Sequence, residues 1–535
     1  MTIYRIKRGS ILGWTYILGG IGLFLLGMGM MTDGLKELAD DALKKWLNRF
    51  TGKTFSSIFF GALITMLIQS SSATTIITIG FVSAGLLTFT QSVGIIIGAN
   101  IGTTSIGWLI SLIGFKINLT AISLPIVGLG VFLTLFTSKR IKPYGSVLTG
   151  FGLLFLGIAT LQNGMVLQEN MLALDYLAGG TFFHKALLII IGFIMTVIMQ
   201  SSGASVATTL TLLHANAISF EQAAFLVIGQ NIGTTITALF AAIGASVTAK
   251  RTALTHVFFN VGTAVMVILF APLLLSLTVY ISTSINGTFD AVLGIAIFHT
   301  LFSVFGSLVF VPFINPFAKF MVKILPEKGN PLTRYLDKNV ASVPALAFGA
   351  AYKTLIEIVN ELTEEVLALM QTQKVSSRFE HKLHNIEDAI TTSRKFLATF
   401  LFTSVEDQNK HLSLIHALDH IDRLIKVLQE GQKTKIINLH GDLTYELTDI
   451  LKKIPISTST DNLKEVASLL KEISAEIANE RRVGRDKYFE QSVRCETELD
   501  TALTKVQALL WIDRLAFHYW RAMERLTDTA VSEEL

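Results

Sequence analysis

Two short polar clusters lie inside long apolar stretches, and their residue types suit the binding of ions. The first reads QSSSATT from Gln69, and the second reads QSSGASVATT from Gln200. Ser and Thr hydroxyls donate hydrogen bonds to anions, and the start of a helix adds free N–H groups and a partial positive charge. The oxygens of Gln, Ser and Thr are also hard ligands that suit a small cation such as sodium. The residue types therefore fit a site for an anion and a cation.

The first cluster lies in a stretch without charge, because residues 54–115 contain no Asp, Glu, Lys, Arg or His. A permanently charged site in the middle of a membrane is expensive. A bound anion would instead be neutralised by a cation bound beside it, which makes obligatory coupling of the two ions physically plausible. Ser, Thr, Gly and Asn also hold membrane helices together without binding a ligand. Packing is the favoured interpretation for any single hydroxyl, and a binding site is favoured for the paired motifs.

The two clusters belong to an internal repeat. They align with an offset of 131 residues, and with the same offset GANIGTT at Gly98–Thr104 falls on GQNIGTT at Gly229–Thr235. Upstream, with an offset of 130, GIGLFLLG at Gly20–Gly27 falls on GFGLLFLG at Gly150–Gly157. Chance similarity between apolar helices would not keep Gln, Asn and Thr in register over this length. The NIGTT segments are expected to interrupt their own helices and to add carbonyl and hydroxyl ligands.

Charge divides the 535 residues into two parts. Residues 1–325 contain 17 Lys and Arg against 8 Asp and Glu, a net charge of +9. The last 210 residues hold 27 basic and 32 acidic residues, a net charge of −5. The first part is interpreted as a membrane part and the second as a soluble part. The excess of basic residues more readily sets membrane topology than binds nucleic acid, and the single cysteine, Cys495, is compatible with a cytoplasmic C-terminal domain.

The membrane part must position the polar clusters, and its apolar runs predict the spanning elements. A membrane-spanning helix needs about 20 mostly apolar residues. The two stretches that carry the clusters, 54–88 and 185–218, are interrupted by Gly, Ser and Thr. Each is predicted to be a hairpin of two shorter helices that enters and leaves on one side. Residues 33–50 are amphipathic and are expected at the membrane surface. The predicted spans are 11–31, 92–114, 119–137, 145–167, 222–247, 254–281 and 289–312.

The number of times that each repeat crosses the membrane predicts the fold class. If each hairpin makes no net crossing, the first repeat crosses three times and the second repeat must be inverted. We therefore predict an all-α polytopic membrane protein with two inverted repeats, each with a re-entrant helical hairpin. A soluble C-terminal helical bundle follows, with helical spacing over 345–372, 376–403 and 407–431. The predicted boundaries are 1–325 for the membrane domain, 11–140 and 141–281 for the repeats, 289–312 for an extra helix, and 331–535 for the bundle.

These motifs resemble the type II sodium/phosphate cotransporter family. QSSSATT with GANIGTT, and QSSGAS with GQNIGTTITALFAAIGAS, look like the two repeats of that family, which has paired QSSS motifs in re-entrant hairpins and a NIGT motif after each. KRTALTHVFFNVG, residues 250–262, resembles the HxxFN segment that follows the family's second repeat. His256 in this segment is interpreted as a packed polar residue rather than a metal ligand. The resemblance covers about residues 11–310.

The resemblance implies sodium-coupled transport of inorganic phosphate. Two departures from the family's motifs stand out. The second motif is QSSG, so Gly203 lacks a hydroxyl, and SIGWLISL follows GANIGTT where animal members carry further polar residues. The number of sodium ions therefore stays open. The implied phosphate ligands are Gln69, Ser70, Ser71, Ser72, Gln200, Ser201 and Ser202, and the implied sodium ligands are Asn100, Thr103, Thr104, Gln200, Ser201, Asn231 and Thr234.

The C-terminal part is similar to PhoU-like domains, which bacterial members of this family often carry. ALDHIDRLIKVL and LLWIDRLAFHYW, which share IDRL at Ile421–Leu424 and Ile512–Leu515, resemble the repeated helix of those domains. PhoU proteins bind metal clusters through acidic motifs. Asp422 and Asp513 stand near the corresponding place, but the second acidic residue of each motif is missing. A solvated charged face is therefore favoured over a metal site.

The sequence as a whole predicts a secondary transporter of a bacterial inner membrane, with its C-terminal domain in the cytoplasm as a regulator. Its partners would be phosphate, sodium as the coupling ion, and the lipid bilayer, without nucleic acid and without a cofactor. A homo-oligomer, or a cytoplasmic partner docked through the bundle, is left open. Two alternatives remain: a membrane phosphate sensor or scaffold without net transport, and a transporter of another oxyanion such as sulfate or a small carboxylate. An enzyme is not expected, because no catalytic triad or metal-ligand spacing occurs.

Overall fold

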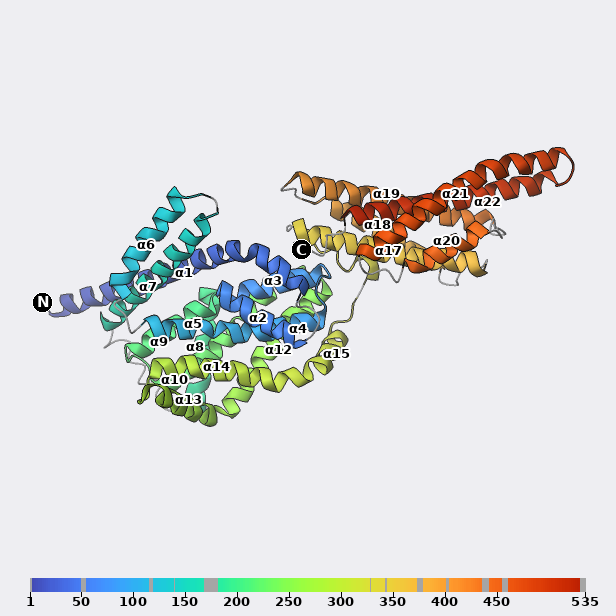
Figure 1. Ribbon diagram of the computed structural model, residues 1–535. Helices are drawn as coiled ribbons and strands as arrows, with labels where there is room; N and C mark the ends of the chain where they lie inside the picture. The colour runs from blue at the N-terminus through green and yellow to red at the C-terminus, as the bar shows by residue number, and fades with distance from the viewer. Residues whose placement is uncertain are drawn as a thin grey trace. The chain divides into compact units, whose positions relative to one another are not determined.

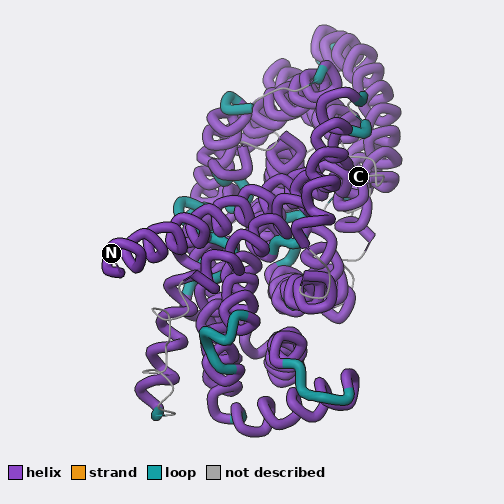
Figure 2. Tube along the Cα trace, turned by 90° about the vertical axis from the view of Figure 1, so that its left-hand side faces the viewer, coloured by secondary structure: helices purple, strands orange, loops and turns teal. Residues whose placement is uncertain are grey.

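Helices make up the described part of the chain, and they form two compact units. A computed structural model describes residues 2–49, 54–114, 119–138, 140–167, 181–327, 329–341, 344–372, 379–400, 404–434, 442–454 and 460–529. Over these ranges the chain is helical with turns between the helices, and none of them contains a β-strand (Figure 2). The first unit comprises Met1–Val82, Leu87–Ile243 and Thr248–Pro326, and the second comprises Ser83–Leu86, Gly244–Val247 and Glu327–Leu535. The predicted all-α class is confirmed for the described residues.

Fifteen α-helices of the first unit are described, and Figure 1 labels them where there is room. They are α1 (Thr2–Arg49), α2 (Thr54–Ile68), α3 (Ser71–Ser83), α4 (Phe89–Thr103), α5 (Ser105–Leu109), α6 (Leu119–Phe136), α7 (Lys142–Leu167), α8 (Phe182–Met199), α9 (Ser202–His214), α10 (Phe220–Gly233), α11 (Thr235–Ala241), α12 (Val247–Leu269), α13 (Ala271–Asn286), α14 (Ala291–Phe310) and α15 (Ile314–Ile324). A π-helical turn, Ile110–Gly114, extends α5.

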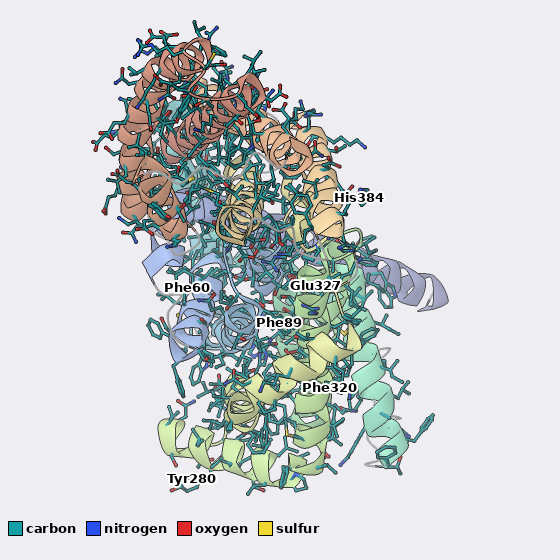
Figure 3. The ribbon with its side chains drawn as sticks, turned by 90° about the vertical axis from the view of Figure 1, so that its right-hand side faces the viewer. Phe60, Phe89, Tyr280, Phe320, Glu327 and His384 are labelled. Atoms are coloured by element: carbon teal, nitrogen blue, oxygen red, sulfur yellow. The ribbon has the colours of Figure 1, made fainter. Side chains whose placement is uncertain are left out.

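The length and apolar composition of these helices make the chain a multi-pass membrane protein. Among the described residues, seven helical stretches satisfy both requirements for a membrane span. Large apolar side chains are exposed on the helices of the first unit, including Tyr280 on α13 and Phe320 on α15, which are 71% and 51% exposed (Figure 3). A bilayer accepts such side chains, whereas water would not. The seven stretches are Leu12–Leu38, Phe89–Leu112, Lys142–Met165, Phe182–Met199, Phe220–Ala241, Val247–Leu269 and Ala291–Ile324.

Both polar clusters break a helix, as the sequence predicts. The first break separates α2 from α3 at Gln69 and Ser70, and the second separates α8 from α9 at Gln200 and Ser201. Each Gln has a left-handed backbone conformation, with φ of 57° for Gln69 and 50° for Gln200. Because a non-glycine residue rarely adopts this conformation, its occurrence at both equivalent positions marks a specific turn. We call these two turns the Gln-Ser junctions.

The NIGTT segments also interrupt their helices. The helix pair α4 and α5 is broken at Thr104, and the pair α10 and α11 is broken at Thr234. Glycines let each pair approach the helix before its junction. A Cβ atom on Gly98 would overlap the carbonyl oxygen of Ile58 in α2, and a Cβ atom on Gly229 would overlap that of Ile189 in α8. Close helix approach at small residues is typical of membrane bundles.

Helices α1 and α7 carry the upstream repeat and pack against each other along their length (Figure 1). A Cβ atom on Gly20 would lie 2.9 Å from the carbonyl oxygen of Gly157, and one on Gly157 would lie 2.8 Å from that of Gly20. The same reciprocity joins Gly27 and Gly150, at 2.6 Å and 2.5 Å. Gly20 is equivalent to Gly150, and Gly27 to Gly157. Each contact therefore occurs twice with the two copies exchanged.

Two expectations about the spans are wrong. Residues 254–281 are not one helix, because α12 ends at Leu269 and α13 begins at Ala271. Pro272 lies in the first turn of α13, where its missing N–H costs no hydrogen bond. The predicted boundary between the span 11–31 and the amphipathic residues 33–50 is wrong too, since α1 continues without a break from Thr2 to Arg49 and its apolar stretch extends to Leu38.

The second unit is a bundle of long helices, as predicted. Its helices are α16 (Lys338–Ala341), α17 (Pro344–Thr372), α18 (Phe379–Leu397), α19 (Val405–Thr434), α20 (Asp442–Lys453), α21 (Thr460–Val493) and α22 (Leu499–Thr529). The two IDRL segments lie on α19 and α22, where Ile421, Leu424, Ile512 and Leu515 are buried. Trp511 Nε1 donates a hydrogen bond to the Val427 carbonyl oxygen at 2.7 Å, which ties these two helices together.

Two short loops belong to the second unit. Ser83–Leu86 lie in the connection from α3 to α4, and Gly244–Val247 lie in the connection from α11 to α12. Lys353 Nζ of α17 donates to the carbonyl oxygen of Gly85, and the Ser246 N–H donates to Asp337 Oδ2 at 2.7 Å. Residues of the bundle thus hold both loops.

Candidate functional site

A cavity of about 290 Å³ lies in the first unit, and both Gln-Ser junctions line it. We call it the junction cavity. Since a water molecule occupies about 30 Å³ in the liquid, it has room for an oxyanion and several waters or ions. All seven residues of the predicted phosphate set line it: Gln69, Ser70, Ser71, Ser72, Gln200, Ser201 and Ser202. Residues 131 positions apart in the sequence therefore meet at one place.

The two helix starts give the junction cavity a partial positive potential. Ser70 Oγ accepts a hydrogen bond from the Ala73 N–H, and Ser201 Oγ accepts one from the Ala204 N–H, each at 3.2 Å. The serines therefore act as N-caps of α3 and α9. The remaining N–H groups of each first turn have no partner within the helix. Two such ends at one cavity suit an anion.

Contacts across the two copies hold the junctions together. Thr237 Oγ1 of α11 donates to Ser72 Oγ of α3 at 3.2 Å. In the equivalent place of the other copy, a Cβ atom on Gly203 would lie 3.7 Å from Ile106 Cγ1. The first contact is a hydrogen bond and the second is apolar. Gly203, which lacks the family's hydroxyl, therefore faces an isoleucine.

The structure divides the predicted sodium set. Thr103, Gln200 and Ser201 line the junction cavity. The other four, Asn100, Thr104, Asn231 and Thr234, are buried outside its lining.

A side chain that the sequence analysis did not propose as a ligand contacts the second NIGTT segment. Asn260 Nδ2 donates to the Asn231 carbonyl oxygen at 2.7 Å and to Thr234 Oγ1 at 3.1 Å. Asn260 comes from the HxxFN segment on α12, as does His256, whose Nε2 lies 3.3 Å from Asn260 Nδ2. His256 is buried, and it packs within this polar group. The HxxFN spacing was the signal that could have identified Asn260.

Several buried oxygens near the second junction have no hydrogen-bond partner. Thr196 Oγ1, Ser205 Oγ and Gln230 Oε1 are all of this kind. Buried polar atoms are rarely left unpaired, so each needs an explanation such as an ion or a water molecule. In the first copy the residues equivalent to Thr196 and Ser205 bond to each other, since Thr65 Oγ1 donates to Thr74 Oγ1 at 2.9 Å. Ala99 takes the place of Gln230 there, and Thr75 Oγ1 is the buried hydroxyl of the first copy without a partner beside its junction.

One face of α1 completes the junction cavity, which the sequence analysis missed. Met28, Thr32, Asp33 and Lys36 line it at helical spacing. Lys36 Nζ lies 3.4 Å from Asp33 Oδ1. These two are the only charged residues among the described residues that line the cavity. Their charges mark the end of an apolar run in the sequence, which is why residues 33–50 were expected at the membrane surface.

Asp422 and Asp513, the two aspartates considered as metal ligands, each lie beside cations. Asp422 pairs with Lys426 at 3.0 Å, and Asp513 lies 3.3 Å from Arg481. The pKa of the Asp513 carboxyl is raised above its usual value, because burial disfavours the charged form and Arg481 offsets only part of this shift. Over the described ranges, no group of three or more His, Cys, Asp and Glu side chains has the geometry of a metal site. The two aspartates thus take part in ion pairs.

Comparison with known proteins gives one family. The sequence model of the family described as Na+/Pi-cotransporter matches residues 23–163 and 180–306. A Bacillus subtilis protein without an assigned function, YqeW, is 32% identical over 308 residues, which cover 57% of this chain and 96% of YqeW. YjbB of Escherichia coli, named for inorganic phosphate export, is 24% identical over 493 residues, covering 88% of this chain and 87% of YjbB.

A more distant relative comes from an animal. The sodium-dependent phosphate transport protein 2A of Rattus norvegicus is 31% identical over 100 residues, which cover 18% of this chain and 15% of that protein. No solved structure matches the chain. The alignment with YjbB is longer than the first unit and therefore extends into the helical bundle.

Proposed function

Because the chain belongs to the Na+/Pi-cotransporter family, we propose that it carries inorganic phosphate across a membrane together with sodium ions. One observation supports this most: the two Gln-Ser junctions, distant in sequence, line one cavity with two helix starts. An oxyanion with four oxygens can accept hydrogen bonds from several directions. The paired hydroxyls and N–H groups supply donors from two sides.

In the proposed site, phosphate binds between the starts of α3 and α9. Ser71 and Ser202 begin these helices, so their N–H groups have no acceptor within the helix. Hydroxyls of Ser70 and Ser201, with the side-chain amide of Gln200, add further donors. Gln69 lines the same cavity, and its amide bonds to Ser105 Oγ. Hydrogen bonds to a charged group contribute about 1.5–3 kcal/mol each, so a few of them suffice for a substrate that must also be released.

Sodium would bind on the side of the second copy. Gln200 and Ser201 line the junction cavity, and the unpaired oxygens of Thr196, Ser205 and Gln230 lie on the neighbouring helices. Neutral oxygens are the ligands that a hard cation prefers. The positive charge of sodium offsets that of the anion, so each ion favours the binding of the other. This supports the coupling of the two ions.

Transport requires the site to open to either side of the membrane in turn. The reciprocal glycine contacts of α1 and α7 support a two-fold axis between the copies, because each contact is repeated with the copies exchanged. Inverted repeats with broken helices at their interface are common among secondary transporters. We propose that the junctions are re-entrant hairpins and that one bundle moves against the other around them.

The helical bundle would regulate this movement as a PhoU-like domain in the cytoplasm of a bacterial cell. Lys353 and Asp337 hold the loops that lead from α3 to α4 and from α11 to α12. The length of the match to YjbB supports a shared two-part architecture. Deleting residues 331–535 is expected to change the transport rate or its response to phosphate. Unchanged transport on both counts would contradict a regulatory role.

The test of the proposed function is flux in proteoliposomes that contain the full chain. Radiolabelled phosphate uptake is measured with and without an inward sodium gradient, and efflux is measured from phosphate-loaded vesicles with the gradient reversed. Sodium-dependent movement of phosphate in either direction supports coupled transport. Faster efflux than uptake would agree with the phosphate export for which YjbB is named. Sulfate and small carboxylates are added as competitors.

Three results would speak against the proposal. Phosphate binding without flux would favour a sensor or scaffold. Flux that sulfate or a carboxylate inhibits more strongly than unlabelled phosphate would indicate another oxyanion. Phosphate flux that does not depend on sodium would remove sodium as the coupling ion.

A further inference from the structure

The junction cavity contains one charged pair that neither the repeated motifs nor the family comparison explains. Asp33 and Lys36 lie on the face of α1 that lines the cavity together with Met28 and Thr32. With the repeat offset of 130, the equivalent positions on α7 hold Asn163 and Val166. The charges therefore belong to one copy only. The shared packing of α1 and α7 does not need them.

The pair is loosely joined. Lys36 Nζ lies 3.4 Å from Asp33 Oδ1, whereas a strong charge-assisted hydrogen bond between such groups measures about 2.7–2.9 Å. The side chains are 41% and 78% exposed, respectively. Exposed ion pairs of this kind contribute little and exchange partners readily. An anion in the same cavity offers Lys36 a second partner.

We propose that Lys36 is a specificity-determining residue. When the oxyanion binds, the Lys36 side chain moves from Asp33 to the oxyanion, and its positive charge favours the doubly charged form of that anion. Every other residue that lines the cavity in the described part of the chain is neutral, so the lysine is the one full positive charge available there. Its departure leaves the Asp33 carboxylate facing the cavity, where it attracts a cation. This inference rests on the proposed function, since it takes phosphate as the anion.

The binding of phosphate would thus leave the negative charge of Asp33, in the wall of the cavity, without the lysine that neutralised it. In the empty cavity the lysine neutralises Asp33. After phosphate binds, the lysine neutralises part of the phosphate charge, and Asp33 becomes a carboxylate without its partner. Two charges separated by about 4 Å still interact appreciably near a protein surface. A sodium ion is therefore drawn to the wall of α1 as well as to the second junction.

The experiment measures the KM for phosphate in proteoliposomes of the full chain from about pH 6 to about pH 8, where phosphate loses its second proton. The wild type should show a falling KM as the pH rises. Lys36→Met should raise KM about tenfold at the high end and remove this pH dependence, with the maximal rate changed less than about threefold. Lys36→Arg should keep the pH dependence, because it keeps the charge.

Asp33→Asn provides the second arm. It removes the competitor for Lys36, so KM for phosphate should fall by about threefold or more, while the sodium concentration for half-maximal rate should rise. The matched control is Lys319→Met, which removes an exposed lysine of α15 that does not line the cavity. It should leave both quantities and the pH dependence unchanged.

Two outcomes would overturn the inference while the proposed function stands. One is wild-type KM and pH dependence in Lys36→Met, and the other is an unchanged KM in Asp33→Asn. If the wild type shows no sodium-dependent flux, the proposed function fails, and calorimetric binding of inorganic phosphate decides this inference by itself. Equal affinity of the wild type and Lys36→Met would then reject it. Weaker binding by Lys36→Met with retained binding by Lys36→Arg would support it.

Discussion

The hydroxyl groups beside the two Gln-Ser junctions are paired differently in the two copies of the repeat. In the first copy, Thr65 and Thr74 bond to each other. The equivalent hydroxyls of the second copy, on Thr196 and Ser205, have no partner. The backbone of the two copies is nevertheless alike, down to the left-handed glutamines. The repeat therefore preserves the scaffold at both places, while this equivalent pair of hydroxyls is bonded in the first copy and unpaired in the second.

The glutamines show the same contrast. Gln69 Nε2 donates to Ser105 Oγ at 3.1 Å, whereas the position equivalent to Ser105 is Ile236 in the second copy. Gln200 is exposed where Gln69 is half-buried. The comparison assigns a structural hydrogen bond to Thr65 and Thr74 of the first copy, and the unpaired oxygens of the second copy are the ones that we propose for sodium. Each of the following variants tests one part of that assignment.

The largest effect is expected where the scaffold is shared. Gly98→Ala and Gly229→Ala would each drive a Cβ atom into a carbonyl oxygen of the neighbouring helix. Overpacking typically costs about 1–3 kcal/mol, and rigid backbone cannot yield as a side chain does, so each variant should lose about 3 kcal/mol or more. Thermal unfolding in detergent measures this.

The control for the glycine variants is Gly128→Ala on α6. An added Cβ atom there has no heavy atom within 4 Å. It should not lower the unfolding temperature, because alanine is the better helix former. A wild-type unfolding temperature for either Gly98→Ala or Gly229→Ala would break the claim that both copies share one scaffold.

The next effect concerns the two N-caps. Ser70→Ala and Ser201→Ala each remove a cap, which costs about 1 kcal/mol, and a donor to the bound anion, which is worth about 1.5–3 kcal/mol. Uptake at low phosphate should therefore fall about tenfold or more in both, with the protein still folded. Initial rates in proteoliposomes measure the fall.

Thr88→Ala separates stability from binding. Thr88 caps α4 in the same manner, and it does not line the junction cavity. It should lose the same stability and keep its transport rate. If transport falls as far as in Ser70→Ala, the effect of the serines reflects stability rather than contact with phosphate.

A smaller effect distinguishes the copies directly. Thr65→Val breaks a hydrogen bond and should cost about 1 kcal/mol of stability with no change in sodium dependence. Thr196→Val breaks none, so without sodium it should be as stable as the wild type. The sodium concentration for half-maximal uptake should rise several-fold in Thr196→Val alone. Equal sodium dependence in the two variants would remove the second copy as the sodium side.

The smallest effect is expected at Gly203, where QSSG stands in place of QSSS. A Cβ atom on Gly203 would lie 3.5 Å from Met28 Cε and 3.7 Å from Ile106, both ordinary contacts. Gly203→Ser should therefore fold normally and gain about 0.5 kcal/mol of helix stability. The added hydroxyl should alter the KM for phosphate by less than about threefold. A large loss of stability would contradict the open space at this position.

The sequence predicted the broken helices and their meeting, because the signals were local. Gln, Ser and Thr repeated in register within apolar runs require a turn whose polar groups find partners, and all seven residues of the predicted phosphate set line one cavity. Their binding of phosphate stays a prediction. The sequence did not show which residues of the predicted sodium set line the cavity and which are buried outside it. The spacing of Asn231 and Thr234 does not reveal that Asn260 contacts both of them.

The errors arose where hydropathy was the only signal. A charged residue at the end of an apolar run has the same appearance whether it meets headgroups or a polar cavity, so Asp33 and Lys36 were assigned to the surface. The break at Phe270 was missed because residues 254–281 contain no Asp, Glu, Lys or Arg to mark an end, and Pro272 was the one sign of a new helix. Hydropathy alone therefore distinguishes neither a surface residue from a cavity residue nor one helix from two.

The reciprocal contacts of α1 and α7 make the glycine face of α1 complementary to itself. A second copy of α1 would present Gly20 and Gly27 to the first as Gly150 and Gly157 now do. Two separate copies of one repeat could therefore pack in the same way. Because both copies belong to one chain, each can differ from the other, as the charged pair on α1 and the glycine at position 203 do.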